Sequence, residues 1–192
     1  GLTVLIGALG GGLNAGLVAG MGLRPLIVTL GTFSLFRGLA EALTHGSKSY
    51  SGFSEEFLAL GNSDLLGVPA QIWIVIVVAL VIWFLVHHTT YGRSLRAIGY
   101  GEDGARYAGL PVKRNISQAY IIAGAVAGLA AVILVSRMGE ARANAGMGYE
   151  LLAITAVVLG GVSIFGGAGN VSGALLGWIA LAILNNGLTR IS

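Results

Sequence analysis

Four stretches of the sequence contain no charged side chain, and each is long enough to cross a lipid bilayer. A helix needs about 20 consecutive apolar residues to span the hydrocarbon core. We therefore expect an all-α fold, a polytopic transmembrane helix bundle with about six membrane segments. The charge-free stretches are residues 1–23, 65–92, 115–136 and 151–189.

Predominantly apolar runs predict full spans at residues 2–22, 25–44, 71–88 and 116–136. The last charge-free stretch is interrupted by Gly160-Gly161 and by the glycine-rich residues 166–169, which predicts two segments, at 151–164 and 171–189. The first of these is short for a crossing. We expect it to be a half-helix or a re-entrant piece, because freed backbone in a membrane must be shielded by protein or by a water-filled cavity.

Composition excludes a soluble globule and a disordered chain. Of the 192 residues, 55% are hydrophobic and 10% are charged, whereas soluble domains carry about 25% charged residues. The absence of cysteine excludes a disulfide framework, a thiol nucleophile and a thiolate metal site. The chain opens on Gly1 without an initiating methionine, so we expect it to be a fragment of a longer polytopic protein.

Glycine, at 32 residues, is unusually frequent, and part of it falls at spacings of four. Small residues at that spacing let two helices approach closely in lipid. We expect helix packing through three such stripes. They are Gly12, Gly16 and Gly20; Gly124 and Gly128; and Gly173 and Gly177. The segment 71–88 has no glycine and is bulky on every face, which predicts a lipid-facing position.

Charge in the loops predicts the orientation. Loop 89–115 carries five basic residues against two acids, whereas loop 46–70 carries Lys48 against three acids. Lys and Arg concentrate on the cytoplasmic side, so loop 89–115 is expected inside and loop 46–70 outside. The net charge is only +3, and five of the 11 basic residues cluster in this one loop. We therefore expect contact with membrane lipid and no nucleic-acid partner.

Within the inner loop, residues 102–108 have the pattern of a short capped helix. Glu102 and Asp103 stand where a helix N-terminus favours negative charge, and Arg106 stands in the last turn. Gly109 suits the left-handed position after the helix, and Pro111 prevents its continuation. The residues alone leave two interpretations open, an ordinary amphipathic connector and a rigid knob that another protein grips.

The sequence contains no motif typical of catalysis or of cofactor binding. The lysines Lys48 and Lys113 are not preceded by a phosphate-binding glycine loop, so any ATP-derived energy must come from another polypeptide. His87 and His88 are adjacent on a helix, diverge by about 100°, and have no acidic partner, which disfavours a metal site. We expect no catalytic residue, no metal and no cofactor, and rank a membrane enzyme lowest.

Several polar residues lie in or beside the spans, and each has a structural and a functional interpretation. Interhelical hydrogen bonds or interface anchoring would explain them, and so would a path for a polar solute. Arg37 and Glu41, four residues apart, favour a snorkelling pair. The candidates for a translocation path are Asn14, Thr29, Tyr149, Glu150, Asn185 and Asn186.

The inner loop also resembles a family pattern, G-R-x-x-x-A-I-G-x-N-x-x-A-A-R-x-S-G-I. The positions that match are Gly92, Arg93, Ala97, Ile98, Gly99, Ala105, Arg106 and Gly109, while Gly101, Gly104, Ala108 and Leu110 depart from it. Further matches lie at residues 25–32, 37–38, 146–151, 153–156, 160–161 and 186–188. With these motifs in order along nearly the whole chain, the sequence resembles permease subunits of ribose-type sugar ABC importers, in the wider group that includes branched-chain amino acid permeases.

The resemblance implies a permease domain over residues 1–192 that forms the path for a simple, ribose-like sugar, and no enzyme activity of its own. It implies ABC ATPase subunits inside, a periplasmic or lipid-anchored sugar-binding protein outside, and a second permease subunit in a homo- or heterodimer of the inner membrane. It assigns ATPase coupling to Glu102, Asp103, Ala105, Arg106 and Gly109. A branched-chain amino acid permease is the alternative, and an ion-coupled secondary transporter ranks lower, because few carboxylates lie within the spans.

Overall fold

A computed structural model describes residues 1–44, 49–65 and 67–191, so the predicted loop charge Lys48 lies outside the described residues. The described chain has five helices long and apolar enough to span a membrane and one shorter apolar helix, Tyr149–Leu159. This confirms the all-α, polytopic fold class. The chain divides into two compact units, residues 1–76 with 113–145 and residues 77–112 with 146–192. These are unit 1 and unit 2, respectively.

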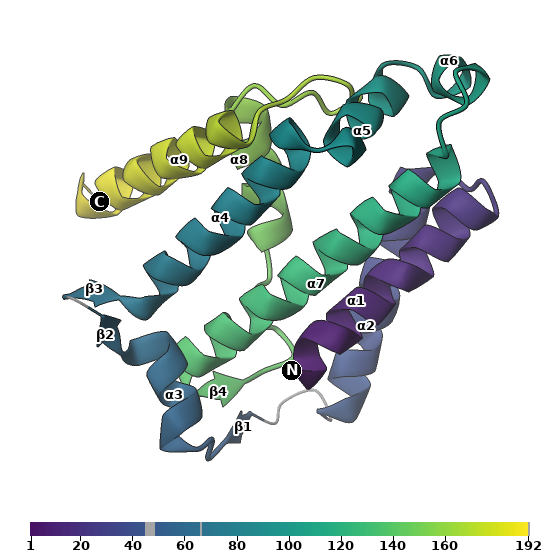
Figure 1. The fold of residues 1–192 in the computed structure, drawn as a ribbon. Helices are drawn as coiled ribbons and strands as arrows, with labels where there is room; N and C mark the ends of the chain where they lie inside the picture. The colour runs from purple at the N-terminus through teal and green to yellow at the C-terminus, as the bar shows by residue number, and fades with distance from the viewer. Residues whose placement is uncertain (45–48, 66, 192) are drawn as a thin grey trace. The chain divides into compact units, whose positions relative to one another are not determined.

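Unit 1 is built from three long helices with small elements at one end (Figure 1). The first helix continues from α1 into a π-helical turn, and α2 begins at a proline, which favours the first helical position because its missing N–H needs no partner there. The elements are α1 (Leu2–Ala15), the π-helical turn (Gly16–Gly20), α2 (Pro25–Leu43), β1 (Tyr50–Ser51), α3 (Glu55–Asn62), β2 (Asp64–Leu65), β3 (Val68–Pro69), α7 (Val112–Met138) and β4 (Glu140–Ala141). Strand β1 pairs antiparallel with β4, and β2 with β3.

Unit 2 holds a helical hairpin and two short helices (Figure 1). Helix α4 runs from unit 1 into unit 2. It is followed by α5 and α6, of which the sequence pattern predicted only α6. The elements are α4 (Ala70–His88), α5 (Thr90–Tyr100), α6 (Glu102–Tyr107), α8 (Tyr149–Leu159) and α9 (Val171–Ile191). The helix in the predicted segment 151–164 ends earlier than expected, at Leu159, because Gly160 ends it and Gly161 then adopts a φ of +77°.

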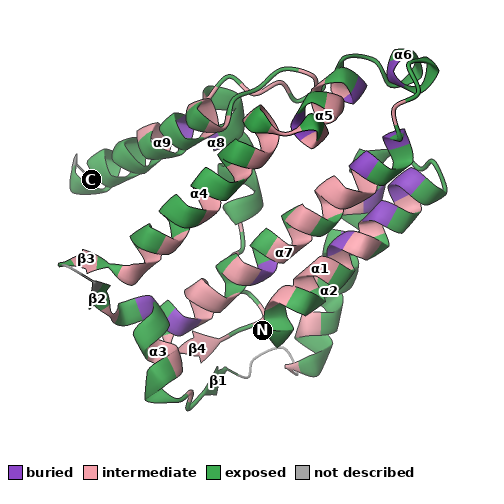
Figure 2. Ribbon diagram, in the orientation of Figure 1, coloured by how far each residue is buried: buried purple, intermediate pink, exposed green. Residues whose placement is uncertain are grey.

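Much of each long helix is exposed (Figure 2), and many of the exposed residues are large hydrophobic ones. Helix α4 contains no buried residue in the described chain, and Leu80 on it is 58% exposed. Contiguous apolar surface of this extent is rare on soluble monomers and marks contact with lipid or protein. Helix α7 has 27 residues and is therefore about 40 Å long, which exceeds a hydrocarbon core of about 30 Å.

Glycines bring α1 and α7 into backbone contact. A Cβ on Gly7 would overlap the Gly124 carbonyl oxygen, and a Cβ on Gly11 would overlap the Tyr120 carbonyl oxygen. The reciprocal overlap, from Gly124 onto the Gly7 carbonyl oxygen, shows that the two helices meet at their closest through this pair of glycines. Gly128 lies against the backbone of Thr3 and Val4.

The expected stripe of Gly12, Gly16 and Gly20 does not make this contact. A Cβ at any of the three would meet no atom of the described chain within 4 Å. Because neighbouring residues on a helix point about 100° apart, contact through Gly7 and Gly11 turns the Gly12 stripe away from α7. The first helix carries two overlapping glycine stripes, and the pattern of small residues does not select between them.

The same type of crossing holds the hairpin of unit 2 together. Cβ atoms on Gly160 and Gly173 would each overlap the other residue's carbonyl oxygen, and one on Gly177 would overlap the Ala156 carbonyl oxygen. Both crossings are antiparallel, and in both a reciprocal glycine pair is followed by a second contact four residues further along each helix. The predicted residues Gly173 and Gly177 lie at this contact, as Gly124 and Gly128 lie at the contact in unit 1.

Antiparallel packing in unit 1 sorts its charges to the two ends. Since Gly7 lies opposite Gly124 and Gly11 opposite Tyr120, the turn at Arg24 after the first helix falls at the end where α7 begins with Lys113 and Arg114. At the other end α3, which carries Glu55 and Glu56 in its first turn, packs on α7. The side of the membrane that each end faces stays a prediction.

Ser136 anchors α3 to the far end of α7. Its side chain is fully buried, and its hydroxyl donates to the Phe57 carbonyl at 2.6 Å. The Asn62 amide donates to the Ser136 carbonyl at 3.2 Å, and Gly61 lies so close to Ser136 and Arg137 that a Cβ would overlap both. This short helix is therefore a fixed part of unit 1.

We predict that Gly11→Val lowers the melting temperature of the full-length protein in detergent by about 2–6 °C, because overpacking costs about 1–3 kcal/mol. Gly12→Val is the matched control, since the same side chain would there enter open space. Thermal unfolding followed by helical circular dichroism measures both. Equal melting temperatures for the two variants would contradict the observed crossing.

Candidate functional site

Helix α6 is a short helix with a well-defined C-terminal cap. Arg106 Nη2 and Glu102 Oε1 form an ion pair at 2.8 Å across one turn, with both side chains more than half exposed. The helix ends in a Schellman motif, in which the Leu110 N–H donates to the Ala105 carbonyl at 3.1 Å and the Gly109 N–H donates to the Arg106 carbonyl at 3.0 Å. Gly109 has a φ of +79°, the left-handed conformation that the sequence predicted at this position.

The side chains of α6 divide into one that is buried and several that project outward. Ala105 is 5% exposed and packs inward, whereas Glu102, Asp103 and Arg106 are exposed. Tyr107 is 91% exposed, although an aromatic ring usually buries much of its surface. Tyr107 was not among the residues predicted for ATPase coupling. The sequence feature that could have pointed to Tyr107 is an aromatic residue at the end of an otherwise polar helix.

Helix α5, which precedes α6, was not predicted, because the charges of loop 89–115 suggested a connector around one short helix. The Thr89 side chain caps its start by accepting a hydrogen bond from the Gly92 N–H at 3.3 Å. Gly92 and Ile98 are its buried residues. Burial also raises the pKa of the Tyr91 phenol above its usual value.

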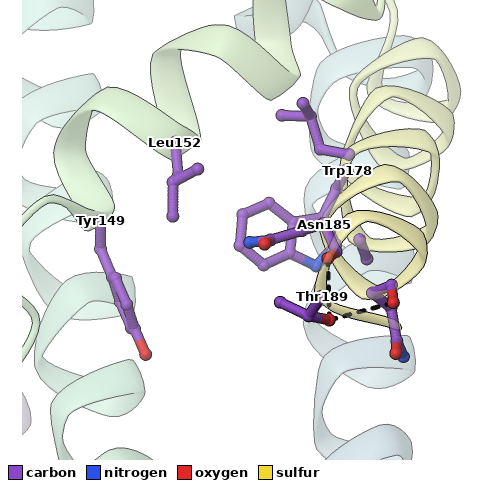
Figure 3. Close-up of a pocket in the computed structure, with 8 residues that line it drawn as sticks. Tyr149, Leu152, Trp178, Asn185 and Thr189 are labelled. Carbon is purple, nitrogen blue, oxygen red and sulfur yellow. Dashed lines mark hydrogen bonds between the residues drawn. The ribbon is translucent and has the colours of Figure 1, made fainter. Parts of the chain in front are cut away.

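A pocket with a volume of about 430 Å³ lies between α8 and α9 (Figure 3). Figure 3 shows Tyr149 and Leu152 reaching from α8 toward a wall formed by α9. Its lining residues are Tyr149, Leu152, Trp178, Leu181, Ala182, Asn185, Asn186 and Thr189. The structure thus brings together three of the predicted path residues, Tyr149, Asn185 and Asn186. Trp178 and Thr189 were not among the predicted path residues.

The pocket combines an apolar body with a few neutral polar groups. None of the eight residues drawn in Figure 3 is charged. The Thr189 hydroxyl lies 3.1 Å from the Asn185 carbonyl oxygen and 3.0 Å from that of Asn186, so it bonds to the backbone of its own helix. The Asn185 and Asn186 side chains are exposed, and each amide offers both donors and an acceptor. Such a lining suits a neutral, hydroxylated solute better than an ion.

The other predicted path residues are not among those lining this pocket. Asn14 and Thr29 belong to unit 1. There the Asn14 Oδ1 accepts a hydrogen bond from the Thr32 hydroxyl at 2.8 Å, which joins α1 to α2, and Thr29 bonds back to the Pro25 carbonyl at 2.9 Å. Glu150 is exposed in the first turn of α8, next to the lining residue Tyr149.

The Arg37–Glu41 pair and the two adjacent histidines make local contacts within their own helices. Arg37 Nε lies 3.6 Å from Glu41 Oε1, and the Arg37 guanidinium also lies over the Phe33 ring. The rings of His87 and His88 pack against Trp83. Among the described residues no group of three or more His, Asp or Glu side chains could hold a metal ion.

Comparison with known proteins places this arrangement in a family. A family model described as the permease component of branched-chain amino acid transport systems matches residues 1–192. The chain belongs to this permease family. With five membrane-length apolar helices, it is a multi-pass protein of the bacterial cytoplasmic membrane. No solved structure gives a significant match.

Curated relatives of the permease family include two kinds of importer. The chain is 42% identical to an autoinducer 2 import system permease protein, LsrD, of Yersinia enterocolitica, over 99% of this chain and 59% of that protein. It is 38% identical to the D-allose transport system permease protein AlsC of Escherichia coli, over 96% and 56%. The chain thus spans a little under three fifths of the length of these relatives.

Two single substitutions should move the stability of α6 in opposite directions. Gly109→Ala places a side chain at φ +79° and should cost about 1 kcal/mol, whereas Gly104→Ala enters open space in the helix and should gain about 1 kcal/mol. We expect amide hydrogen exchange at Leu110 to become roughly fivefold faster in the first variant and fivefold slower in the second. Changes of the same sign in both variants would contradict the capped helix.

Proposed function

We propose that the full-length protein containing this chain is the transmembrane permease subunit of an ATP-driven ABC importer and forms the translocation path for a simple, ribose-like monosaccharide. The observation that carries the proposal is the match to the permease family over residues 1–192, together with relatives at 38–42% identity whose names refer to autoinducer 2 and D-allose import. ATP hydrolysis belongs to a separate subunit, and this chain contributes the path and its coupling to that motor.

Helix α6 is the proposed contact with the ATPase. A motor can move a membrane helix only through an element that is stiff and accessible. The Glu102–Arg106 ion pair and the Schellman motif at Gly109 stiffen α6, and its outward side chains are exposed. Tyr107 extends the proposed contact surface, because exposed aromatic side chains are frequent anchors in protein interfaces.

The pocket between α8 and α9 is the proposed part of the path in unit 2. Amide side chains of Asn185 and Asn186 can exchange hydrogen bonds with sugar hydroxyls, and the Trp178 ring offers a flat apolar face. Asn14, Thr29 and Glu150 stay path candidates outside this pocket. Few strong contacts are expected along a path, since a transporter must release its cargo.

A branched-chain amino acid is the second candidate cargo, because the family description names such a transport system. An amino acid zwitterion would bring two charges into a pocket whose lining residues include no charged side chain. Removing charges from water without partners is costly, so the neutral lining favours the sugar. The remaining proposed partners are a periplasmic or lipid-anchored sugar-binding protein and a second permease subunit, identical or different.

Uptake into membrane vesicles tests the proposed function. The full-length protein, assembled with its ATPase and binding protein, should take up a labelled monosaccharide such as ribose or allose when ATP is present, and should not take up leucine. Asn185→Ala should lower sugar uptake roughly fivefold, the effect of about one hydrogen bond. Leu176→Ala, on α9 outside the pocket lining, should leave uptake near the native level.

ATP-dependent uptake of leucine in place of a sugar would overturn the cargo assignment. Equal uptake by Asn185→Ala and Leu176→Ala would instead remove the pocket from the path while leaving the importer assignment intact.

Side-specific labelling tests the proposed orientation. The sequence contains no cysteine, so Asp103→Cys and Glu55→Cys each introduce a reactive thiol against little background. We expect an impermeant maleimide to label Asp103→Cys only from the cytoplasmic side and Glu55→Cys only from the outside, because the positive-inside rule puts loop 89–115 inside. Labelling of position 103 from outside would reverse the topology and exclude α6 as the ATPase contact.

A further inference from the structure

The last turn of α5 touches the loop that joins α8 to α9 at Gly99, where no side chain separates the two backbones, and the Tyr100 ring lies against Gly167 beside this contact. A Cβ on Gly99 would overlap the amide nitrogen of Gly167, and a Cβ on Gly166 would lie 3.3 Å from the Gly99 Cα. Gly166 and Gly167 have φ values of +93° and +78°, which other residues rarely adopt. Backbone therefore meets backbone at this point, which we call the Gly99 joint (Gly99, Gly166 and Gly167).

The loop side of the joint is braced by its own hydrogen bonds. The Ser163 N–H donates to the Ala168 carbonyl at 2.9 Å, and the Ala168 N–H donates to the Gly166 carbonyl at 3.0 Å. The loop continues into the two helices that cross through Gly160 and Gly173. A displacement applied to the loop is therefore applied to the α8–α9 hairpin as a whole.

The other side of the joint is continuous with α6. A single residue, Gly101, separates α5 from α6, and its N–H and carbonyl are hydrogen-bonded to Ala97 and Ala105, one on each side. At its start α5 is held against the end of α4, where a Cβ on Gly92 would overlap the Val86 carbonyl and Arg96 donates to the same carbonyl at 3.4 Å. Helix α5 thus contacts α4 at its start and has α6 and the Gly99 joint at its far end.

We propose that α5 is a lever and that the Gly99 joint passes displacement of α6 directly into the α8–α9 hairpin, which carries the pocket with Asn185 and Trp178. Gly99 is a positioning residue in this scheme, and the inference rests on the proposed contact between α6 and an ATPase. Close-packed contacts resist compression, so a push on α5 moves the loop rather than being absorbed by rotating side chains. A side chain at position 99 would hold the two backbones apart and make the contact compliant.

The test uses the complete importer in vesicles, with Gly99→Val as the variant and Ala97→Val as its matched control. Ala97 is exposed on the same turn region of α5, so the control adds a branched side chain without entering the joint. We expect Gly99→Val to retain the ATPase subunit and its ATP hydrolysis but to transport at least tenfold less sugar per ATP hydrolysed. Ala97→Val should keep the native ratio.

A second measurement on the native complex needs no substitution. Amide hydrogen exchange in residues 99–101 and 163–168 should change together when a non-hydrolysable ATP analogue is added. Native transport with an unchanged ratio in Gly99→Val, or exchange changes confined to one of the two segments, would overturn the lever. Failure of the native complex to retain an ATPase or to transport sugar would instead overturn the proposed function.

Discussion

Direct contact between helix backbones is the constraint on which this structure depends. In lipid, apolar side chains gain little by leaving one apolar surrounding for another, so helices associate through dispersion, weak hydrogen bonds and shape. Glycine removes the side chain that would keep two backbones apart. Here Gly7 and Gly124 in unit 1, and Gly160 and Gly173 in unit 2, place carbonyl oxygens where any Cβ would overlap them. The exposed apolar faces of the same helices are then left for lipid or protein partners.

The apolar pattern predicted the spanning helices well, because lipid demands the same run of residues whatever the fold. Helices α2 and α4 begin and end within one residue of the predicted limits. Helix α7 extends beyond its predicted span on both sides, since a helical backbone can continue into polar sequence outside the hydrocarbon core. Helix α5 was missed for the related reason that its exposed, charged face resembles a loop when hydropathy is the guide.

Part of the candidate site was also predictable from the sequence, and part was not. The cap of α6 was predictable because Gly109 and Pro111 leave the backbone few conformations, and the observed φ at Gly109 agrees. The pocket was predictable only in part. Asn185 and Asn186 are conspicuous as polar residues in an apolar helix, whereas Trp178 belongs to a type that packs equally well against lipid. Which of two glycine stripes faces a neighbour depends on helix rotation, and sequence spacing alone does not define it.

The glycine crossings also bear on conformational entropy. A glycine has no rotamers to lose, so closing such a contact freezes no side-chain torsion, in contrast to a core of leucine or methionine. There is accordingly one way to close it rather than a choice among many repacked arrangements. For a protein whose helices associate within a bilayer, the contact between Gly160 and Gly173 therefore defines one docking geometry, whereas a surface of large flexible side chains would allow several.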